Sequence, residues 1–199
     1  MIMGKIFYIM GKSASGKDHI YALLAQKKEL GLRNFVLYTT RPIRVEEEEG
    51  KQYHFVDSRK LEEFEEQGRV IEARSYDTIH GIWTYFTADD GQIDLEEADY
   101  LGIGTLESYV KMRRYYGEES VCPIYVEVED GERLERALKR ERGQQIPRYE
   151  EMCRRFLADQ KDFSEENIRK AGIDRRFYNT DLEGCVEEIG KYVKSFRVK

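Results

Sequence analysis

A short segment near the N-terminus sets the strongest constraint on how this chain folds. The apolar run "KIFYIM" (residues 5–10) is rich in aromatic and β-branched residues and ends at Gly11, which predicts a short buried strand. Residues 16–28 fit a helix that begins just after a glycine-containing turn. A strand that passes through such a turn directly into a helix is a building unit of parallel α/β sheets.

The rest of the chain alternates strand and helix patterns in the same way. Strands are predicted over 34–40, 53–56, 69–76 and 82–87 (the two arms of a hairpin), 99–104, 121–128 and 175–179. Helices are predicted from a cap at Ser58 to about residue 67, after the strands 99–104 and 121–128, over the arginine-rich region 132–162, and from about residue 181. This alternation predicts an α/β protein with a mainly parallel sheet between two layers of helices, and a small β-rich lobe around the hairpin.

Composition excludes several classes of protein. The 199 residues are 40% hydrophobic and 36% charged, enough apolar side chains for a core. The formal net charge of −6 argues against a dedicated nucleic-acid binder. The three cysteines form no CxxC pair, and no apolar run has the length of a membrane span or a signal peptide. We therefore expect no nucleic-acid partner, no membrane association and a cytoplasmic location.

The turn after the first strand has the spacing of a phosphate-binding loop. Gly11, Gly16 and Lys17 fit the pattern GxxxxGK, in which backbone N–H groups and the helix N-terminus surround phosphate oxygens and the lysine reaches the β and γ phosphates. The string alone is common enough to occur in an ordinary β–α turn with an exposed lysine, but its place between a strand and a helix favours a P-loop. The predicted ATP-binding loop residues are Gly11, Ser13, Ala14, Ser15, Gly16, Lys17 and Asp18.

Asp18 is unusual, because the residue after a P-loop lysine is normally a Ser or Thr that holds a magnesium ion. A carboxylate is also a hard oxygen ligand. We therefore expect Asp18 to bind Mg directly or through water, and phosphate binding to depend more strictly on the metal.

The P-loop and the stretch "YTTRPIRVEEEEGKQYHFV" (residues 38–56) together resemble the guanylate kinase family, whose pattern there is TTRxPRxGExxGxxYxF. The resemblance implies that Arg41, Arg44 and Tyr53 bind the phosphate of an acceptor nucleotide. Two guanidinium groups on a proline-stiffened loop suit one phosphate. The alternative is a surface cluster that neutralises the acidic run 46–49.

The resemblance also assigns the base site, with some departures from the family pattern. Glu72 matches a glutamate that accepts hydrogen bonds from guanine, which presents adjacent N–H donors where adenine does not. A serine expected before the TTR segment is Leu37, and the YG(S/T) signature is absent, leaving His80 or Tyr85 as substitutes.

The strand that ends in DxD in the family departs more seriously. It carries Gly102 and Gly104 at the aligned positions. Asp18, with Glu107 nearby, is a hypothetical replacement for the missing acids.

Arginines toward the C-terminus resemble those of a lid that closes over the transferred phosphoryl group. Arg136 and Arg140 lie four residues apart on one predicted helix face, and Arg154 and Arg155 follow, with Arg155 the better match. Such residues act electrostatically on charge that develops during transfer. The alternative is a solvated, salt-bridged helix. Asn179 matches a family asparagine beside the donor nucleotide.

The resemblance implies a single guanylate-kinase-like domain with a P-loop NTPase core. The core would comprise 1–35, 99–131 and 171–199, the acceptor-binding lobe 36–98 and the lid region 132–170. It further implies phosphate transfer from ATP to GMP or dGMP with Mg, catalysed through Lys17, Arg136, Arg140 and Arg155, in a monomer or homodimer.

Two other functions stay open. Ribose bisphosphate kinases of guanylate-kinase type are similar in having Asp after the P-loop lysine and in lacking the DxD strand. A non-catalytic guanylate-kinase-like binding module is the third possibility, although such modules typically lose the phosphate loop.

Overall fold

The larger of two sheets forms the centre of the protein, for which a computed structural model describes residues 4–78 and 81–196. Its five parallel strands lie in the order β2-β7-β1-β8-β9. They are β1 (Ile6–Met10), β2 (Leu32–Asn34), β7 (Asp99–Gly104), β8 (Val121–Glu127) and β9 (Arg176–Tyr178). The first predicted strand is thus the central one, and Met10 at its end pairs with Gly104 at the end of β7.

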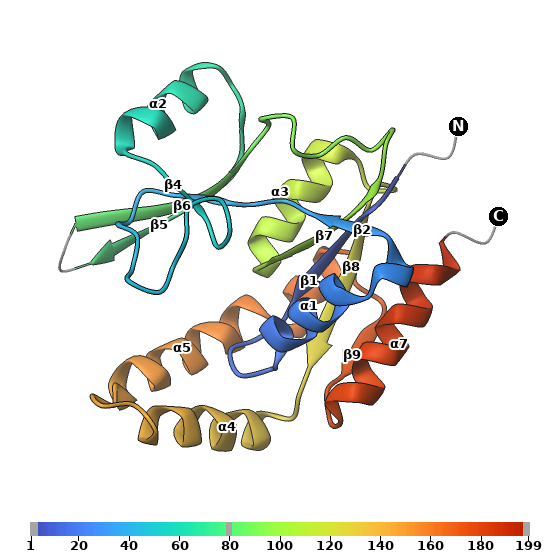
Figure 1. The fold of residues 1–199 in the computed structure, drawn as a ribbon. Coiled ribbons are helices and arrows are strands. Elements are labelled where there is room, and N and C mark those ends of the chain that lie inside the picture. Colours follow the sequence, from blue (N-terminus) through green and yellow to red (C-terminus); the bar gives the residue numbers. More distant parts are fainter. Residues whose placement is uncertain (1–3, 79–80, 197–199) are drawn as a thin grey trace.

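Helices cover both faces of this sheet, as the alternation of elements predicted. Successive side chains of a strand point to opposite faces, so Tyr8 packs with α3 (Leu106–Tyr116), whereas Phe7 and Ile9 pack with α1 (Lys17–Gln26) and α7 (Leu182–Ser195). Because both faces are covered, every residue of β1 is apolar and buried. The three-layer α/β/α core is therefore confirmed (Figure 1).

The β-rich lobe has a sheet of its own. Four strands, in the order β4-β3-β6-β5, are β3 (Tyr38–Thr39), β4 (His54–Phe55), β5 (Val70–Thr78) and β6 (Gly81–Ala88). β5 and β6 form the expected antiparallel hairpin. Helix α2 (Ser58–Glu66) covers this sheet through Phe64, which packs against Phe86.

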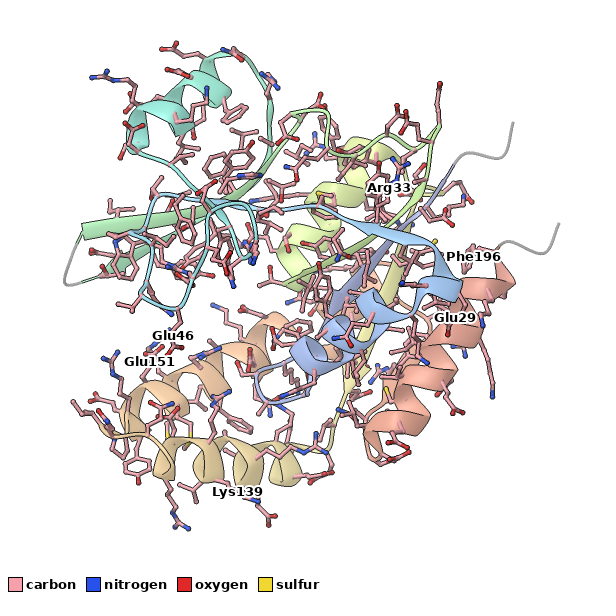
Figure 2. All side chains as sticks on the ribbon, in the orientation of Figure 1. Glu29, Arg33, Glu46, Lys139, Glu151 and Phe196 are labelled. Carbon is pink, nitrogen blue, oxygen red and sulfur yellow. The ribbon has the colours of Figure 1, made fainter. Side chains whose placement is uncertain are left out.

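The predicted arginine-rich helical region contains two helices. These are α4 (Asp130–Arg142) and α5 (Tyr149–Asp162), joined by a turn that contains Gly143 and Pro147. The short helix α6 (Glu165–Lys170) follows α5. A short 3₁₀ helix, η1 (Lys28–Leu30), follows α1. In Figure 1 the lobe and the α4–α5 pair project from the same side of the core. Figure 2 shows Glu46 on the lobe and Glu151 on α5, both on these projections.

Two predictions about local structure are wrong. The run 34–40 is split between the sheets, because the N–H and C=O of Val36 bond to the side chain of Gln92 at 2.8 and 3.1 Å instead of to a strand. The cap of α2 is Asp57, not Ser58, since the Asp57 carboxylate accepts the N–H of Lys60 at 2.9 Å. Among the described residues, the helices are all too short or too polar to cross a bilayer.

Candidate functional site

The loop between β1 and α1 has the tight backbone of a phosphate-binding turn. Gly16 has φ +84°, and a Cβ there would lie 2.4 Å from Nδ2 of Asn179. A Cβ on Gly11 would lie 2.5 Å from the carbonyl oxygen of Val126. Both glycines are therefore required by close backbone approach, and Ala14 also adopts a positive φ of 62°.

Asn179 holds this loop in place from the end of β9. Its Nδ2 donates to the carbonyl oxygen of Ser15 at 2.8 Å, and its backbone N–H donates to the carbonyl of Glu127 at 2.9 Å. The guanidinium of Arg136 donates to the carbonyl of Asn179 at 3.0 Å. The structure thus places Asn179, a predicted ATP-binding residue, and Arg136, a predicted lid arginine, beside the loop.

The interior of the loop suits an anionic ligand. The hydroxyl of Ser15 is buried and has no hydrogen-bond partner among the described residues, and a buried polar atom normally has one. Together with the helix N-terminus at Lys17 and the loop amides, this hydroxyl fits a ligand that is rich in acceptors, such as a polyphosphate.

Lys17 and Asp18 sit at the start of α1 with very different exposure. The Lys17 side chain is 19% exposed, that of Asp18 is 81% exposed, and Nζ of Lys17 lies 3.6 Å from Oδ2 of Asp18. Within the described ranges, three or more His, Cys, Asp or Glu side chains nowhere gather as a metal site. A magnesium ion at Asp18 would therefore take most of its ligands from phosphate oxygens and water, as Mg²⁺ commonly does. Glu107 is paired with Lys111 at 2.7 Å.

A buried arginine that the sequence analysis missed ties the loop to α4 and α5. Arg133 is 1% exposed, and its Nε donates to the carbonyl of Ser13 at 3.0 Å. Its guanidinium also pairs with Asp130 at 2.5 Å and with Asp159 at 3.3 Å. Asp159 in turn accepts the backbone N–H of Ser13 at 2.7 Å. Arg133 sits in a run of charged residues that reads as a solvated helix, so no pattern in the sequence distinguished it.

Two of the other predicted lid arginines lie at a small cavity beside the loop. Arg140 and Arg155 both line this cavity, of about 30 Å³, together with Ser13. Arg154 instead pairs with Glu151 at 2.6 Å on the exposed side of α5. Of the two adjacent arginines, Arg155 is therefore the one beside the loop.

In the lobe, Arg41 and Tyr53 come together and Arg44 does not join them. Arg41 is 3% exposed and forms two hydrogen bonds of 2.5 and 2.7 Å to Glu47. Its guanidinium lies over the ring of Tyr53, with the carbon of the group 5.3 Å from the ring centroid, and its Nε donates to the hydroxyl of Tyr85 at 3.2 Å. Arg44 is exposed.

This arrangement bears on two alternatives left open by the sequence. Neutralisation of the acidic run does occur at Glu47, whose pKa falls to about 2 mainly because of its hydrogen bonds with Arg41, but the arginine is buried and not on the surface. Tyr85 is the tyrosine beside Arg41, whereas His80 lies outside the described residues.

Glu72 lies on the same face of the lobe sheet as these groups. It is 2% exposed, and its carboxylate accepts from Nε of Arg74 at 3.1 Å and from the hydroxyl of Thr87 at 3.0 Å. In the β5–β6 ladder Glu72 is opposite Thr87 and Arg74 is opposite Tyr85, so all four side chains share one face. Arg74 and Thr87 were not predicted, because their place beside Glu72 depends on the register of the hairpin.

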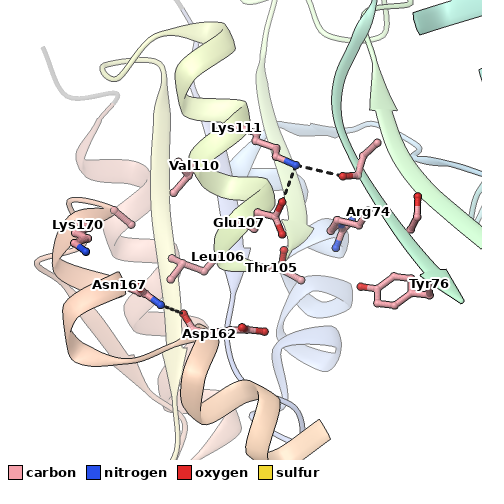
Figure 3. A pocket seen from close by; sticks show the side chains of 13 residues that line it. Arg74, Tyr76, Thr105, Leu106, Glu107, Val110, Lys111, Asp162, Asn167 and Lys170 are labelled. Atoms are coloured by element: carbon pink, nitrogen blue, oxygen red, sulfur yellow. Dashed lines mark hydrogen bonds and ion pairs between the residues drawn. The ribbon is translucent and has the colours of Figure 1, made fainter.

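A pocket of about 730 Å³ opens between this face and the core. Figure 3 shows Arg74 and Tyr76 of β5 on one side, and Thr105 and Glu107 at the start of α3 on the other. Thr105 follows Gly104, whose partner Met10 directly precedes the phosphate loop. Since paired strands are about 4.8 Å apart, this wall of the pocket adjoins the loop.

Tyr8 fills the space beside the two glycines that replace the expected acids. A Cβ on Gly102 would lie 2.7 Å from the ring of Phe35, and one on Gly104 would lie 2.2 Å from the Tyr8 hydroxyl. That hydroxyl donates to Oγ of Ser108 at 2.9 Å, and burial raises the pKa of Tyr8. Acids at 102 and 104 are therefore sterically incompatible with this packing.

Comparisons with known proteins agree with this fold. A family model described as guanylate kinase matches residues 3–83. The guanylate kinase of Porphyromonas gingivalis is 26% identical over 200 residues, covering 99% of this chain and all of the relative, and that of Syntrophomonas wolfei is 41% identical over 80 residues, covering 39% of this chain and 40% of the relative. The crystal structure of guanylate kinase from Anaplasma phagocytophilum superposes with a TM-score of 0.63 at 19% identity, covering 99% of this chain and 88% of that chain.

The parallel core and the loop after its central strand define an α/β protein with the P-loop NTPase fold. Within that class, the resemblance seen in the sequence is confirmed. Over residues 3–83 the chain matches the guanylate kinase family, and over its full length it is similar to guanylate kinases at low identity, as a divergent relative would be.

Proposed function

We propose that this protein is a guanylate kinase-like phosphotransferase that converts ATP and GMP, or dGMP, to ADP and GDP with the help of Mg. One observation carries the proposal: groups suited to a phosphate and a group suited to guanine share one face of the lobe, and that face borders the pocket beside the phosphate loop. As a kinase of free nucleotides it would act in the cytoplasm, as a monomer or homodimer.

Each half of the site would bind one substrate. The loop amides and Lys17 would hold the phosphates of ATP, while Arg41, Tyr53 and Tyr85 would hold the acceptor phosphate. The Arg41–Glu47 pair keeps the guanidinium oriented before the acceptor arrives. A magnesium ion held at Asp18 would neutralise phosphate charge.

The two helices α4 and α5 would supply the positive charge for transfer. Arg140 and Arg155 line the cavity next to Ser13, and Arg136 lies at Asn179. Guanidinium groups fixed near the transferred phosphoryl group stabilise its charge, and closure of these helices over the site would exclude water. No general base is needed, because the acceptor oxygen already belongs to a phosphate.

The test is a comparison of acceptors. We expect ADP release from ATP and Mg with GMP and dGMP, and much less with AMP, UMP or ribose 1,5-bisphosphate. Lys17→Ala should lower turnover by at least about 100-fold, because Lys17 contacts the charge that develops during transfer.

Lys28→Ala is the matched control, since Lys28 is an exposed lysine beyond the end of α1, and it should leave turnover unchanged. Turnover with ribose 1,5-bisphosphate but with none of the nucleotides would instead indicate a ribose bisphosphate kinase. An absence of turnover with every acceptor would favour a binding module.

A further inference from the structure

Arg74 occupies an unusual place in the proposed acceptor site. It lies two residues after Glu72 on β5, on the same face of the sheet, and it lines the pocket of about 730 Å³ where Glu72 itself does not. Its Nε and one terminal nitrogen lie 3.1 and 3.4 Å from the two carboxylate oxygens of Glu72. A guanidinium has five N–H donors, so these two contacts leave donors on its pocket side.

The pair therefore presents an acceptor and a donor next to each other. Guanine offers the complementary edge, with N–H donors at N1 and the 2-amino group beside the acceptor oxygen O6, and arginine is the usual partner of guanine O6 and N7. Adenine offers the opposite order, an amino donor at C6 beside an acceptor at N1. Facing this pair, adenine would set donor against donor and acceptor against acceptor.

Other nearby groups are less able to donate to O6. Leu37 is apolar, and the hydroxyl of Thr87 already donates to Glu72 at 3.0 Å. The ammonium of Lys111 pairs with Glu107 at 2.7 Å and donates to the carbonyl of Ala73 at 3.3 Å, contacts that are drawn in Figure 3. Arg74 is thus the donor best placed between Glu72 and the pocket.

We propose that Arg74 determines the acceptor base by donating to the C6 carbonyl of a 6-oxopurine, while Glu72 accepts from the neighbouring N–H groups. The inference rests on the proposed function and deepens it. The carboxylate accepts three hydrogen bonds in the free protein and has about four lone-pair sites. One site therefore remains, and the longer Arg74 contact at 3.4 Å would have to move aside for guanine to reach this carboxylate, whose side chain is 0% exposed.

The experiment compares kcat/KM for GMP and for 6-thio-GMP, which keeps both N–H donors and replaces O6 by a poorer acceptor. We expect wild type to prefer GMP by about 10-fold or more, the discrimination typical of one base contact. Arg74→Met keeps much of the side-chain length but has no donor. It should lower kcat/KM for GMP by about 10- to 100-fold, mostly through KM, and abolish the preference over 6-thio-GMP. Arg74→Lys should keep part of the preference.

Two controls separate this role from a structural one. Arg59→Ala removes an exposed arginine from the same lobe and should change neither value. The KM for ATP should stay at the wild-type value in Arg74→Met, which shows that the core is folded. A GMP to 6-thio-GMP ratio that is unchanged in Arg74→Met would overturn the inference while leaving the proposed function intact. No turnover of GMP by wild type would contradict both.

Discussion

At the scale of single residues, the carboxylate of Glu47 decides how the buried guanidinium of Arg41 is held. The two groups share a bidentate contact, and Glu47 also accepts the backbone N–H of Arg44 at 3.0 Å. These bonds favour the charged form of the acid, so its pKa is about 2 instead of the ordinary 4.5.

A lowered pKa has a definite consequence for stability. In the unfolded chain Glu47 takes up its proton near pH 4.5, whereas in the folded protein it stays ionised down to about pH 2. Its contribution is therefore complete above the unfolded pKa and is lost as the pH falls through about 2. We expect the free energy of unfolding to fall more steeply between pH 4.5 and pH 2 in wild type than in Glu47→Gln.

The measurement is urea unfolding at several pH values, combined with carbon NMR titration of the Glu47 carboxyl. Glu46→Gln, at an exposed neighbouring position, is the control and should keep the wild-type slope. A Glu47 carbon that titrates near its ordinary pKa would contradict the expectation.

A residue of the site was predictable from the sequence where a motif specifies its position. It was unpredictable where its role depends on which residue it contacts in the folded protein. Arg41 and Tyr53 are three-dimensional neighbours, as the motif indicated. Arg74 and Thr87 became visible only in the structure, because a strand pattern does not state which residue lies opposite Glu72.

At the scale of elements, Arg133 connects the phosphate loop to the helices α4 and α5. It bonds to Ser13, Asp130 and Asp159 from a position that is 1% exposed. We expect Arg133→Met to lower the free energy of unfolding by about 3 kcal/mol, because removing one member of a buried ion pair leaves its partners uncompensated.

Urea unfolding and hydrogen exchange at the Ser13 amide measure this effect. Exchange should become faster in Arg133→Met, since Asp159 loses the charge that orients it. Arg142→Met changes an exposed arginine at the end of the same helix and should have little effect on either quantity. Equal losses of unfolding free energy in Arg133→Met and Arg142→Met would contradict this role of Arg133.

Elements with strong patterns were predicted closely, as β7 shows, whose bounds match the expected 99–104. The run 34–40 was not, because its apolar pattern continues through Val36 while a side chain from a distant loop, Gln92, takes the backbone bonds that a strand would use. Such tertiary competition leaves no local signal in the sequence.

At the scale of the whole molecule, the cysteines report on the integrity of the core. Cys122 and Cys185 are buried on one side of the main sheet, and burial raises the pKa of each to about 11, whereas Cys153 is exposed on α5. Thiolates react and thiols do not. We expect one of the three thiols to react quickly with Ellman's reagent at pH 8 in the native protein, and all three in urea.

Cys153→Ser is the control, and its native form should show no fast reaction. Two or more fast thiols in native wild type would mean that the sheet and α7 open readily, which contradicts the packing described above.

The layered fold followed from alternation alone, since parallel strands must be covered on both faces. The position of the lobe next to the phosphate loop did not follow from this alternation. It depends on the pairing of Met10 with Gly104 and on the position of α3. Both are set by packing between segments about a hundred residues apart in the sequence.

The packing of Tyr8 against Gly102 and Gly104 also limits how this chain can change. A Cβ at 104 would lie 2.2 Å from the Tyr8 hydroxyl and 2.4 Å from Oγ of Ser108, so an aspartate does not fit there unless these side chains change as well. Shrinking Tyr8 alone opens a cavity in the core, which is itself destabilising. An acid at 104 and a smaller residue at 8 are therefore each unfavourable without the other, so a DxD strand in this chain would require several coupled substitutions.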